Sequence, residues 1–256
     1  MRFALYSDLH LERRFLDCWQ PPRLDVDAVI LAGDISNLTQ GIEWASRSFA
    51  GKRVIVVSGN HELYGGSLLD LSAMRTFAAR RKVDFLENSR TTIGNVRFLG
   101  ATLWSDFSLY GKEKTQIRAM REAQASIADY RAIRGAEGYP LEPGETLRRH
   151  AETVAFLDNE LGHAFEGGTV VVTHFAPHRS CIAPQFLGGA LTPYFVSDLA
   201  WLMKKHDIDV WCHGHTHTNV DFVAENSCRV VSNQMGYAWE YDSGDMDFRP
   251  DLIIEV

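Results

Sequence analysis

The chain has 256 residues, of which 45% are hydrophobic and 23% are charged, and this composition is typical of a globular protein. Its formal net charge of -7 provides no global attraction for nucleic acid or for anionic membranes. No apolar run approaches the ~20 residues that span a bilayer, and polar residues interrupt the N-terminus too early for a signal peptide. Four scattered cysteines without a CxxC pair favour a reduced compartment, so we expect a cytoplasmic protein with no membrane partner.

Short apolar runs that end in polar residues predict strands buried on both faces. The first three are "RFALY" before "SDLH", "DAVILA" before "GDIS", and "RVIVVS" before "GNHE". Asp34 lies 26 positions after Asp8 and 26 before Asn60, a spacing close to the ~30 residues of one βαβ unit. Apolar residues at helical spacing in 39–50 predict one of the intervening helices.

The middle of the chain predicts more helix than strand. Residues 67–82 read as a helix and 83–88 as a strand, and the Gly-Asn turn in "TTIGNVRFLGATL" predicts a hairpin. Residues 113–134 predict one long amphipathic helix, and 145–161 predict a second. We therefore expect a single α/β domain over residues 1–256 with a helical insertion near 107–145. The basic side chains of this insertion belong either to a solvated helix face or to a lid that faces phosphate.

Strands return near the C-terminus. "TVVVT" runs into "HFAP", "IDVWC" runs into "HGHTH", and "SCRVVSNQ" and "LIIEV" follow. The stretch "HGHTH" holds three histidines in five positions, which packing alone does not explain.

Oxygen and imidazole donors gather in five loops, each directly after a predicted strand. Such loops converge at the carboxyl ends of the strands in open α/β sheets. Donors of this kind suit Mn, Fe, Zn or Co, and they are numerous enough for two ions with one bridging aspartate. Polar caps of strand ends are the alternative, but caps do not require histidine at five of these eight positions. The residues concerned are Asp8, His10, Asp34, Asn60, His61, His174, His215 and His217.

The pattern "DLH … GD … GNHE … H … GHTH" closely resembles the calcineurin-like metallophosphoesterases, and it runs from residue 8 to residue 217 with all five blocks in the family's order. The resemblance implies a four-layer α/β/β/α sandwich of two mixed sheets, with the late strands in the second sheet. It also implies a dinuclear centre. One ion would be held by Asp8, His10 and His217, the second by Asn60, His174 and His215, and Asp34 would bridge them.

The resemblance further implies a mechanism. His61 would act as general acid to the leaving alkoxide, and the nucleophile would be a metal-bridging hydroxide. Manganese is the expected metal, with iron, zinc, cobalt or nickel as alternatives. His215 and His217, two positions apart, point from one side of an extended loop, and Gly214 allows an unusual turn there.

Some positions depart from particular branches of the family. The protein serine/threonine phosphatases have an aspartate and an arginine where this chain has Asn37 and Leu38, so a protein-phosphatase role is not expected. Asn37 can still accept a hydrogen bond from His61. His213 either supports the metal site, contacts substrate or fills the core. His178 and Arg179, on the loop after His174, are either phosphate contacts or a solvated pair.

We therefore expect hydrolysis of a small phosphomonoester or phosphodiester. A cyclic-nucleotide phosphodiesterase or a nuclease is the alternative, although the lack of a broad basic charge disfavours long nucleic acid. A catalytically silent binding scaffold of the same fold, or a protein with one structural metal, is the alternative outside catalysis. The complete ligand set and His61 favour an enzyme.

Overall fold

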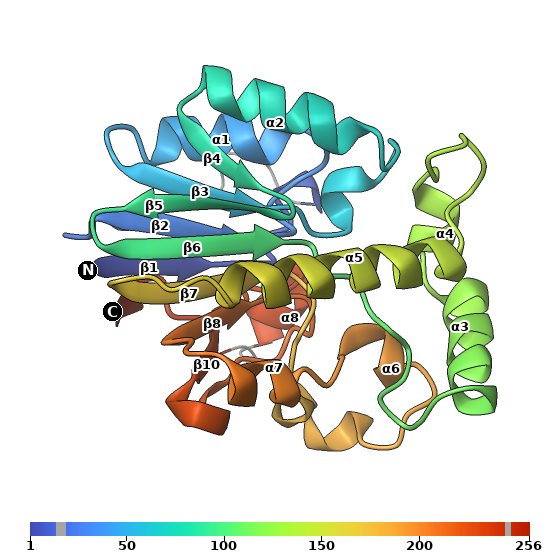
Figure 1. Cartoon of the computed structure of the whole chain (residues 1–256). Coiled ribbons are helices and arrows are strands. Elements are labelled where there is room, and N and C mark those ends of the chain that lie inside the picture. Colours follow the sequence, from blue (N-terminus) through green and yellow to red (C-terminus); the bar gives the residue numbers. More distant parts are fainter. Residues whose placement is uncertain (14–18, 244–246) are drawn as a thin grey trace.

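Two β-sheets packed face to face form the centre of the molecule (Figure 1). The computed structural model describes residues 1–13, 19–243 and 247–256. The first sheet has the order β11-β1-β2-β3-β4, and all its neighbours are parallel except β11. Its strands are β1 (Arg2–Tyr6), β2 (Ala28–Ala32), β3 (Arg53–Val57), β4 (Val83–Leu86) and β11 (Ile253–Glu255).

The second sheet has the order β5-β6-β7-β8-β10-β9, in which the inner strands are parallel and the edge strands β5 and β9 are antiparallel. The predicted hairpin is confirmed as β5 and β6, joined through a left-handed Gly94. The strands are β5 (Ser89–Ile93), β6 (Val96–Ala101), β7 (Gly168–Thr173), β8 (Val210–His213), β9 (Asp221–Val223) and β10 (Arg229–Ser232).

Alternation along each strand supplies two layers of core. Phe3 and Leu5 of β1 pack between the sheets, whereas Ala4 and Tyr6 face the helices. Strands of both sheets read as continuous apolar runs because both of their faces are buried. Burying each large side chain of this kind contributes about 1.5–3 kcal/mol.

Helices cover the outer faces of both sheets, so the expected arrangement of two mixed sheets flanked by helices is confirmed (Figure 1). α1 and α2 lie against the first sheet and α5 against the second. The helices are α1 (Gln40–Ser48), α2 (Asp70–Arg80), α3 (Lys114–Ser126), α4 (Asp129–Ala132), α5 (Pro143–Leu161), α6 (Thr192–Phe195), α7 (Ala200–Lys205) and α8 (Ala238–Ser243).

Two local predictions were wrong. The long helix over 113–134 is interrupted, because Ile127 is extended (φ -83°, ψ 136°) and separates α3 from α4. The last strand, β11, joins the first sheet beside β1, because Ile254 fills the apolar layer between the sheets from that edge. The other late strands lie in the second sheet as expected.

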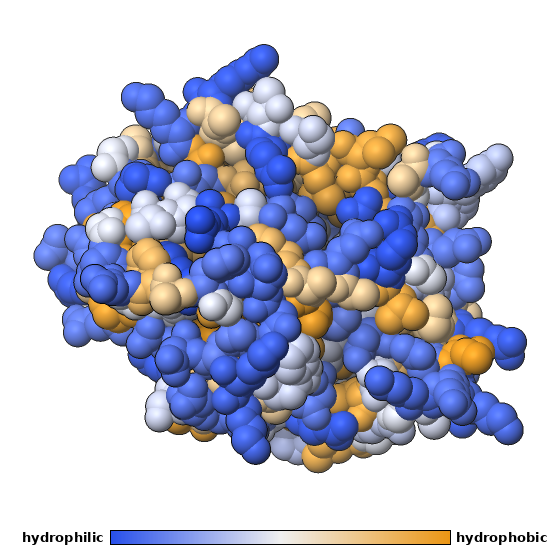
Figure 2. All heavy atoms as spheres, in the orientation of Figure 1, coloured by the Kyte–Doolittle hydropathy of each residue, from blue (hydrophilic) through white to orange (hydrophobic). Residues whose placement is uncertain are grey.

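Three further properties of the described residues concern helix length, surface hydropathy and the cysteines. Among the described residues, no helix combines the length and the apolar character that a membrane span requires. Figure 2 shows apolar residues in short patches separated by hydrophilic ones. Cys181, Cys212 and Cys228 are buried free thiols, and Cys18 lies outside the described residues.

Candidate metal centre

The sheets bring the predicted ligands to one edge of the molecule. β1 is followed by Asp8 and His10, and β2 is followed by Asp34. Asn60 follows β3, in the loop that also carries His61. Since these strands are parallel, their carboxyl ends lie side by side. β7 and β8 of the second sheet contribute His174, His215 and His217 to the same edge.

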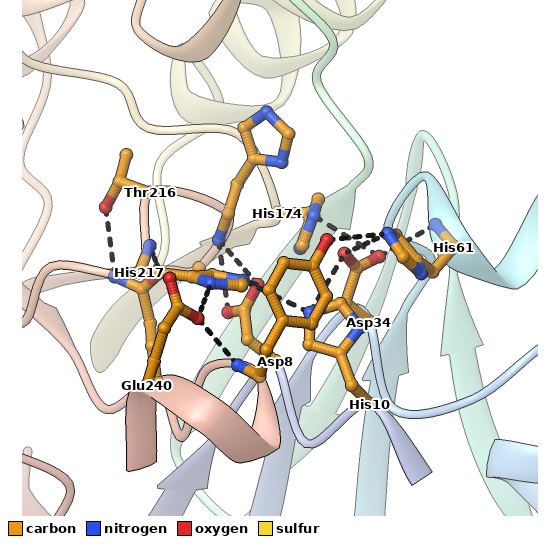
Figure 3. Close-up of polar contacts among 12 residues, drawn as sticks. Asp8, His10, Asp34, His61, His174, Thr216, His217 and Glu240 are labelled. Carbon is orange, nitrogen blue, oxygen red and sulfur yellow. Dashed lines mark hydrogen bonds and ion pairs between the residues drawn. The ribbon is translucent and has the colours of Figure 1, made fainter. Parts of the chain in front are cut away.

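The first set of ligand atoms belongs to Asp8, His10 and His217. These atoms lie within 4.8 Å of one another. Nε2 of His10 is 3.1 Å from Nε2 of His217, which is in turn 3.4 Å from Oδ1 of Asp8 (Figure 3). Two imidazole nitrogens and a carboxylate that converge in this way match the ligand preferences of borderline divalent metals.

The second set belongs to Asp34, His174 and His215. Nε2 of His174 is 3.5 Å from Oδ1 of Asp34 and 3.1 Å from Oδ1 of Asn60, which places the predicted amide ligand here. Nε2 of His215 is buried and has no hydrogen-bond partner in the described part of the chain. An orphaned imidazole nitrogen beside a buried carboxylate fits a metal ion well.

Asp34 connects the two sets. Its other oxygen, Oδ2, lies 3.8 Å from Nε2 of His10, and Asp34, His10 and His61 form a third close triplet. One carboxylate therefore faces both sets, one oxygen toward each. This is the arrangement that a bridging ligand requires.

The backbone at this edge is strained. Asp8, Asp34 and His215 have φ values of 53°, 55° and 74°, and His10 and His217 are also left-handed. Such angles are uncommon in residues other than glycine, and they gather at functional sites. Here they turn the side chains toward one another.

Gly214 was expected to allow an unusual backbone turn, but its role in this loop is different. The left-handed residues are the histidines that follow it, not Gly214 itself. A Cβ at Gly214 would lie 2.6 Å from Oδ2 of Asp8 and 3.0 Å from the carbonyl oxygen of Ala32. The position is glycine because the backbone passes directly over the carboxylate of Asp8.

Glu62, the last residue of the "GNHE" block, holds two ligand loops together. Its buried carboxylate accepts hydrogen bonds from the backbone N–H groups of Asp34 (2.9 Å), Ile35 (2.7 Å) and Gly59 (2.7 Å). Burial and the nearby charge of Asp34 raise the pKa of Glu62 to about 7. The sequence analysis recognised the "GNHE" block, which ends in Glu62, but predicted no role for this glutamate.

Two further acidic residues support ligands, and neither was predicted. Oε2 of Glu240, in α8, lies 2.6 Å from Nδ1 of His217 and leaves the other nitrogen facing the first set. Asp129, in α4, accepts a hydrogen bond from Nδ2 of Asn60 at 2.9 Å. Such partners orient a ligand and fix its protonation state.

The buried carboxylates and imidazoles of the site shift one another's pKa values. Burial would raise the pKa of Asp8, but its hydrogen bond with His217 and the nearby His174 hold it at about 2. Burial would lower the pKa of His174 and His217, yet adjacent carboxylates raise them to about 9 and about 10. Burial lowers the pKa of His215, which favours the neutral imidazole that binds metal.

His61 belongs to neither of the two ligand sets that Asp34 connects, but it lies close to Asp34 and His10. Its Nδ1 is 2.9 Å from Oε1 of Glu12, and its Nε2 is 3.3 Å from the hydroxyl of Tyr237 and 4.0 Å from Oδ2 of Asp34. Its ring stacks on Tyr64 with centroids 4.1 Å apart. Burial would lower its pKa, but the charges of Asp34 and Glu12 raise it, which favours an imidazolium that can donate a proton.

The remaining candidates make other contacts. Asn37 does not accept from the imidazole of His61; its Nδ2 donates to the backbone oxygen of His61 at 2.9 Å. His178 lies 3.3 Å from Glu225, and Arg179 pairs with Asp198. His213 is buried in β8, where burial lowers its pKa to about 4, and its Nδ1 donates to the carbonyl oxygen of Gly214 at 3.0 Å.

Comparison with known proteins agrees with this architecture. A family model described as calcineurin-like phosphoesterase matches residues 1–219. The solved structure of a phosphopantetheinyl hydrolase from Mycobacterium tuberculosis has a TM-score of 0.74 at 20% identity, covering 94% of this chain and 91% of its own. A dimetal phosphatase from Danio rerio has a TM-score of 0.56 at 16% identity, covering 91% of this chain and 86% of its own. No curated protein sequence matches the chain.

Proposed function

Because the chain belongs to the calcineurin-like phosphoesterase family, whose model matches residues 1–219, we propose that it hydrolyses a phosphomonoester or a phosphodiester with two divalent metal ions. Family membership makes the protein a metal-dependent phosphoester hydrolase. The observation that carries the finer proposal is the position of Asp34 between two sets of ligand atoms. The first ion would bind Asp8, His10 and His217, the second would bind Asn60, His174 and His215, and Asp34 would bridge them.

The metal ions and the side chains of the chain would contribute differently to the reaction. When bound, two cations acidify a water molecule and neutralise charge on the phosphate oxygens. The chain's own contribution is to fix the ligands and to place Nε2 of His61 beside this edge, where it donates a proton to the leaving oxygen. Mixed imidazole and carboxylate donors support manganese, with iron, zinc, cobalt or nickel as alternatives.

A nucleotide substrate is the second candidate, and the aromatic residues of α8 and the loop before it favour it. The hydroxyl of Tyr237 is 3.3 Å from Nε2 of His61, and the ring of Tyr237 stacks on Trp239 with centroids 6.3 Å apart. Trp239 is 70% exposed. An exposed indole on the side of the proton donor provides a surface on which a planar leaving group stacks.

The test is hydrolysis by metal-depleted protein that is refilled with Mn²⁺. Matched p-nitrophenyl mono- and diesters are assayed beside a nucleotide panel and a phosphopantetheinyl ester, the class named for the Mycobacterium tuberculosis neighbour. We expect metal-dependent turnover that falls roughly 10²–10⁴-fold in His61→Asn. The exposed His163→Asn serves as the matched control. Two bound ions without turnover of any ester would favour a binding scaffold, and failure to bind two ions would refute the proposal.

For the nucleotide candidate, Trp239→Ala is compared with wild type. If Trp239 stacks on a base, the variant should have a higher KM for nucleotides, because it loses about 1–3 kcal/mol of binding free energy. Its kinetics on p-nitrophenyl phosphate should be unchanged. An equal loss on both substrates would remove the nucleotide candidate.

A further inference from the structure

Glu12 contacts two histidines of the site through a single oxygen. It lies in the short 3-10 turn Leu11–Arg13 that follows the first ligand loop. Its Oε1 is 2.9 Å from Nδ1 of His61 and 3.2 Å from Nδ1 of His10. The Glu12 side chain is only 11% exposed, and the guanidinium Nε of Arg13 is 3.8 Å from the same oxygen. A largely buried carboxylate that accepts from an imidazole is well placed to fix the orientation of the ring.

No other described carboxylate contacts the same nitrogen of His61. Asp34 approaches Nε2, on the other side of the ring, at 4.0 Å. Asn37 bonds the backbone of His61 and not its imidazole. Glu12 therefore occupies the place that the sequence pattern suggested for Asn37, although it comes from a different loop.

The direction of the ring follows from this contact. With Nδ1 donating to Glu12, Nε2 is the nitrogen that faces Asp34 and the hydroxyl of Tyr237. The stack on Tyr64, with an interplanar angle of 23°, restricts rotation of the ring. The proton that His61 can transfer is thus held at Nε2, toward the reacting edge.

We propose that Glu12 is the positioning residue of the proton donor His61; this inference rests on the proposed phosphoester hydrolysis. In the step, the oxygen of a water molecule forms a bond to phosphorus and releases a proton to solvent, while the bond from phosphorus to the leaving oxygen breaks. The proton on Nε2 moves to that leaving oxygen. His61 becomes neutral with its remaining proton on Nδ1, still donated to Glu12, and a solvent proton restores Nε2–H. Glu12 keeps the remaining proton on Nδ1, so Nε2 is the nitrogen that is reprotonated and that donates in each cycle.

The kinetic test is a leaving-group series on Glu12→Gln at saturating Mn²⁺. Phenyl phosphate needs protonation of its leaving oxygen, whereas 2,4-dinitrophenyl phosphate does not. We expect kcat to fall roughly 10²-fold for phenyl phosphate and only a few-fold for the activated ester. In a His61→Asn background the same change should add almost nothing, because the two residues act as a unit. Equal losses on both esters, or the same selective loss in Asn37→Ala instead of Glu12→Gln, would overturn the assignment.

A readout that does not need turnover separates this inference from the proposed function. In the metal-depleted protein, we expect a downfield Nδ1 proton resonance of His61 by ¹⁵N-edited NMR, lost or shifted upfield in Glu12→Gln. Its persistence unchanged in the variant would show that Glu12 does not hold the ring. If the wild type shows this resonance, the variant loses it, and the wild type hydrolyses no ester, then the proposed function is wrong but the contact between Glu12 and His61 is confirmed. Metal content is measured on each sample, because Glu12 also contacts His10.

Discussion

Asp129, in α4, accepts a hydrogen bond at 2.9 Å from Nδ2 of Asn60, in the loop after β3. The same carboxylate accepts from the hydroxyls of Tyr64 (2.8 Å) and Tyr194. Because a carboxylate only accepts, it fixes which end of the Asn60 amide points inward. Oδ1 is thereby left 3.1 Å from Nε2 of His174, on the metal side. The buried side chain of Asp129 thus connects α4 to the candidate metal centre.

Asp129→Asn is expected to weaken binding of the second ion. An asparagine can donate as well as accept, so the Asn60 amide is free to flip and withdraw its oxygen. Loss of such a supporting contact typically costs about 10–100-fold in metal affinity. Titration of metal-depleted protein with Mn²⁺ by calorimetry measures it. The exposed Glu137→Gln, between α4 and α5, is the control, and equal affinities in all three proteins would contradict the role of Asp129.

Gly214→Ala is expected to destabilise the protein and to displace Asp8. The added Cβ would meet Oδ2 of Asp8 at 2.6 Å and the backbone oxygen of Ala32 at 3.0 Å, and a backbone atom cannot move aside easily. Overpacking of this kind costs about 1–3 kcal/mol. Gly144→Ala, in α5 with no atom within 4 Å of the new Cβ, should be neutral or stabilising by up to about 1 kcal/mol. Denaturant unfolding in EDTA compares the two, and an undamaged Gly214→Ala would refute the steric argument.

The sequence predicted where the candidate ligands lie because each stands directly after an apolar strand. β1, β2, β3, β7 and β8 all exist, and parallel pairing within each sheet brings their carboxyl ends to common edges. The candidate ligands therefore meet in space as the pattern indicated. Hydrophobic periodicity carries this information because the burial of both strand faces is encoded locally.

The supporting residues could not be predicted in the same way. Glu12, Asp129 and Glu240 lie on short helices. Glu12 is two positions from His10, but no spacing in the sequence links Glu12 to His61, Asp129 to Asn60 or Glu240 to His217. The interruption between α3 and α4 at Ile127 was missed for the same reason, because it depends on tertiary contacts. Residues 113–134 have helical periodicity throughout, but Asp129 is buried among three tertiary donors, and its position depends on contacts that no local pattern encodes.

Substitution of Asp34 is expected to remove both ions, whereas substitution of His217 should remove one. Oδ2 of Asp34 faces His10 at 3.8 Å and its Oδ1 faces His174 at 3.5 Å, so each set depends on it. His217 contacts the first set alone. Elemental analysis of Asp34→Asn and His217→Asn after gel filtration in Mn²⁺ gives the stoichiometry. One ion retained by Asp34→Asn at full affinity would exclude a bridging role.

Chelation should lower the thermal stability of the wild type more than that of Asp34→Asn. Each ion that binds only the folded chain adds about 2.7 kcal/mol when its free concentration is 100 times its Kd. A variant that binds no ion has no such stabilisation to lose. The melting temperatures are compared with and without EDTA. Equal shifts in the two proteins would show that the stabilising ions bind elsewhere.

His150 should make the stability of the fold depend on pH. It is buried in α5 at 5% exposure, and its Nδ1 donates to the backbone oxygen of Trp104 at 3.3 Å. Burial lowers its pKa from 6.5, and the charge of Asp106 opposes this only in part. The unfolded chain therefore binds a proton that the folded chain excludes, so stability is complete above pH 6.5 and is lost as the pH falls toward the folded pKa.

The measurement is the free energy of unfolding of wild type and His150→Gln between pH 7.5 and 5, in EDTA so that metal release does not contribute. Glutamine cannot titrate, so the wild type should lose more stability than the variant on acidification. The difference approaches about 1.4 kcal/mol per pH unit below the unfolded pKa. Parallel curves would mean that His150 gains its proton in the folded state, and then burial would not control its charge.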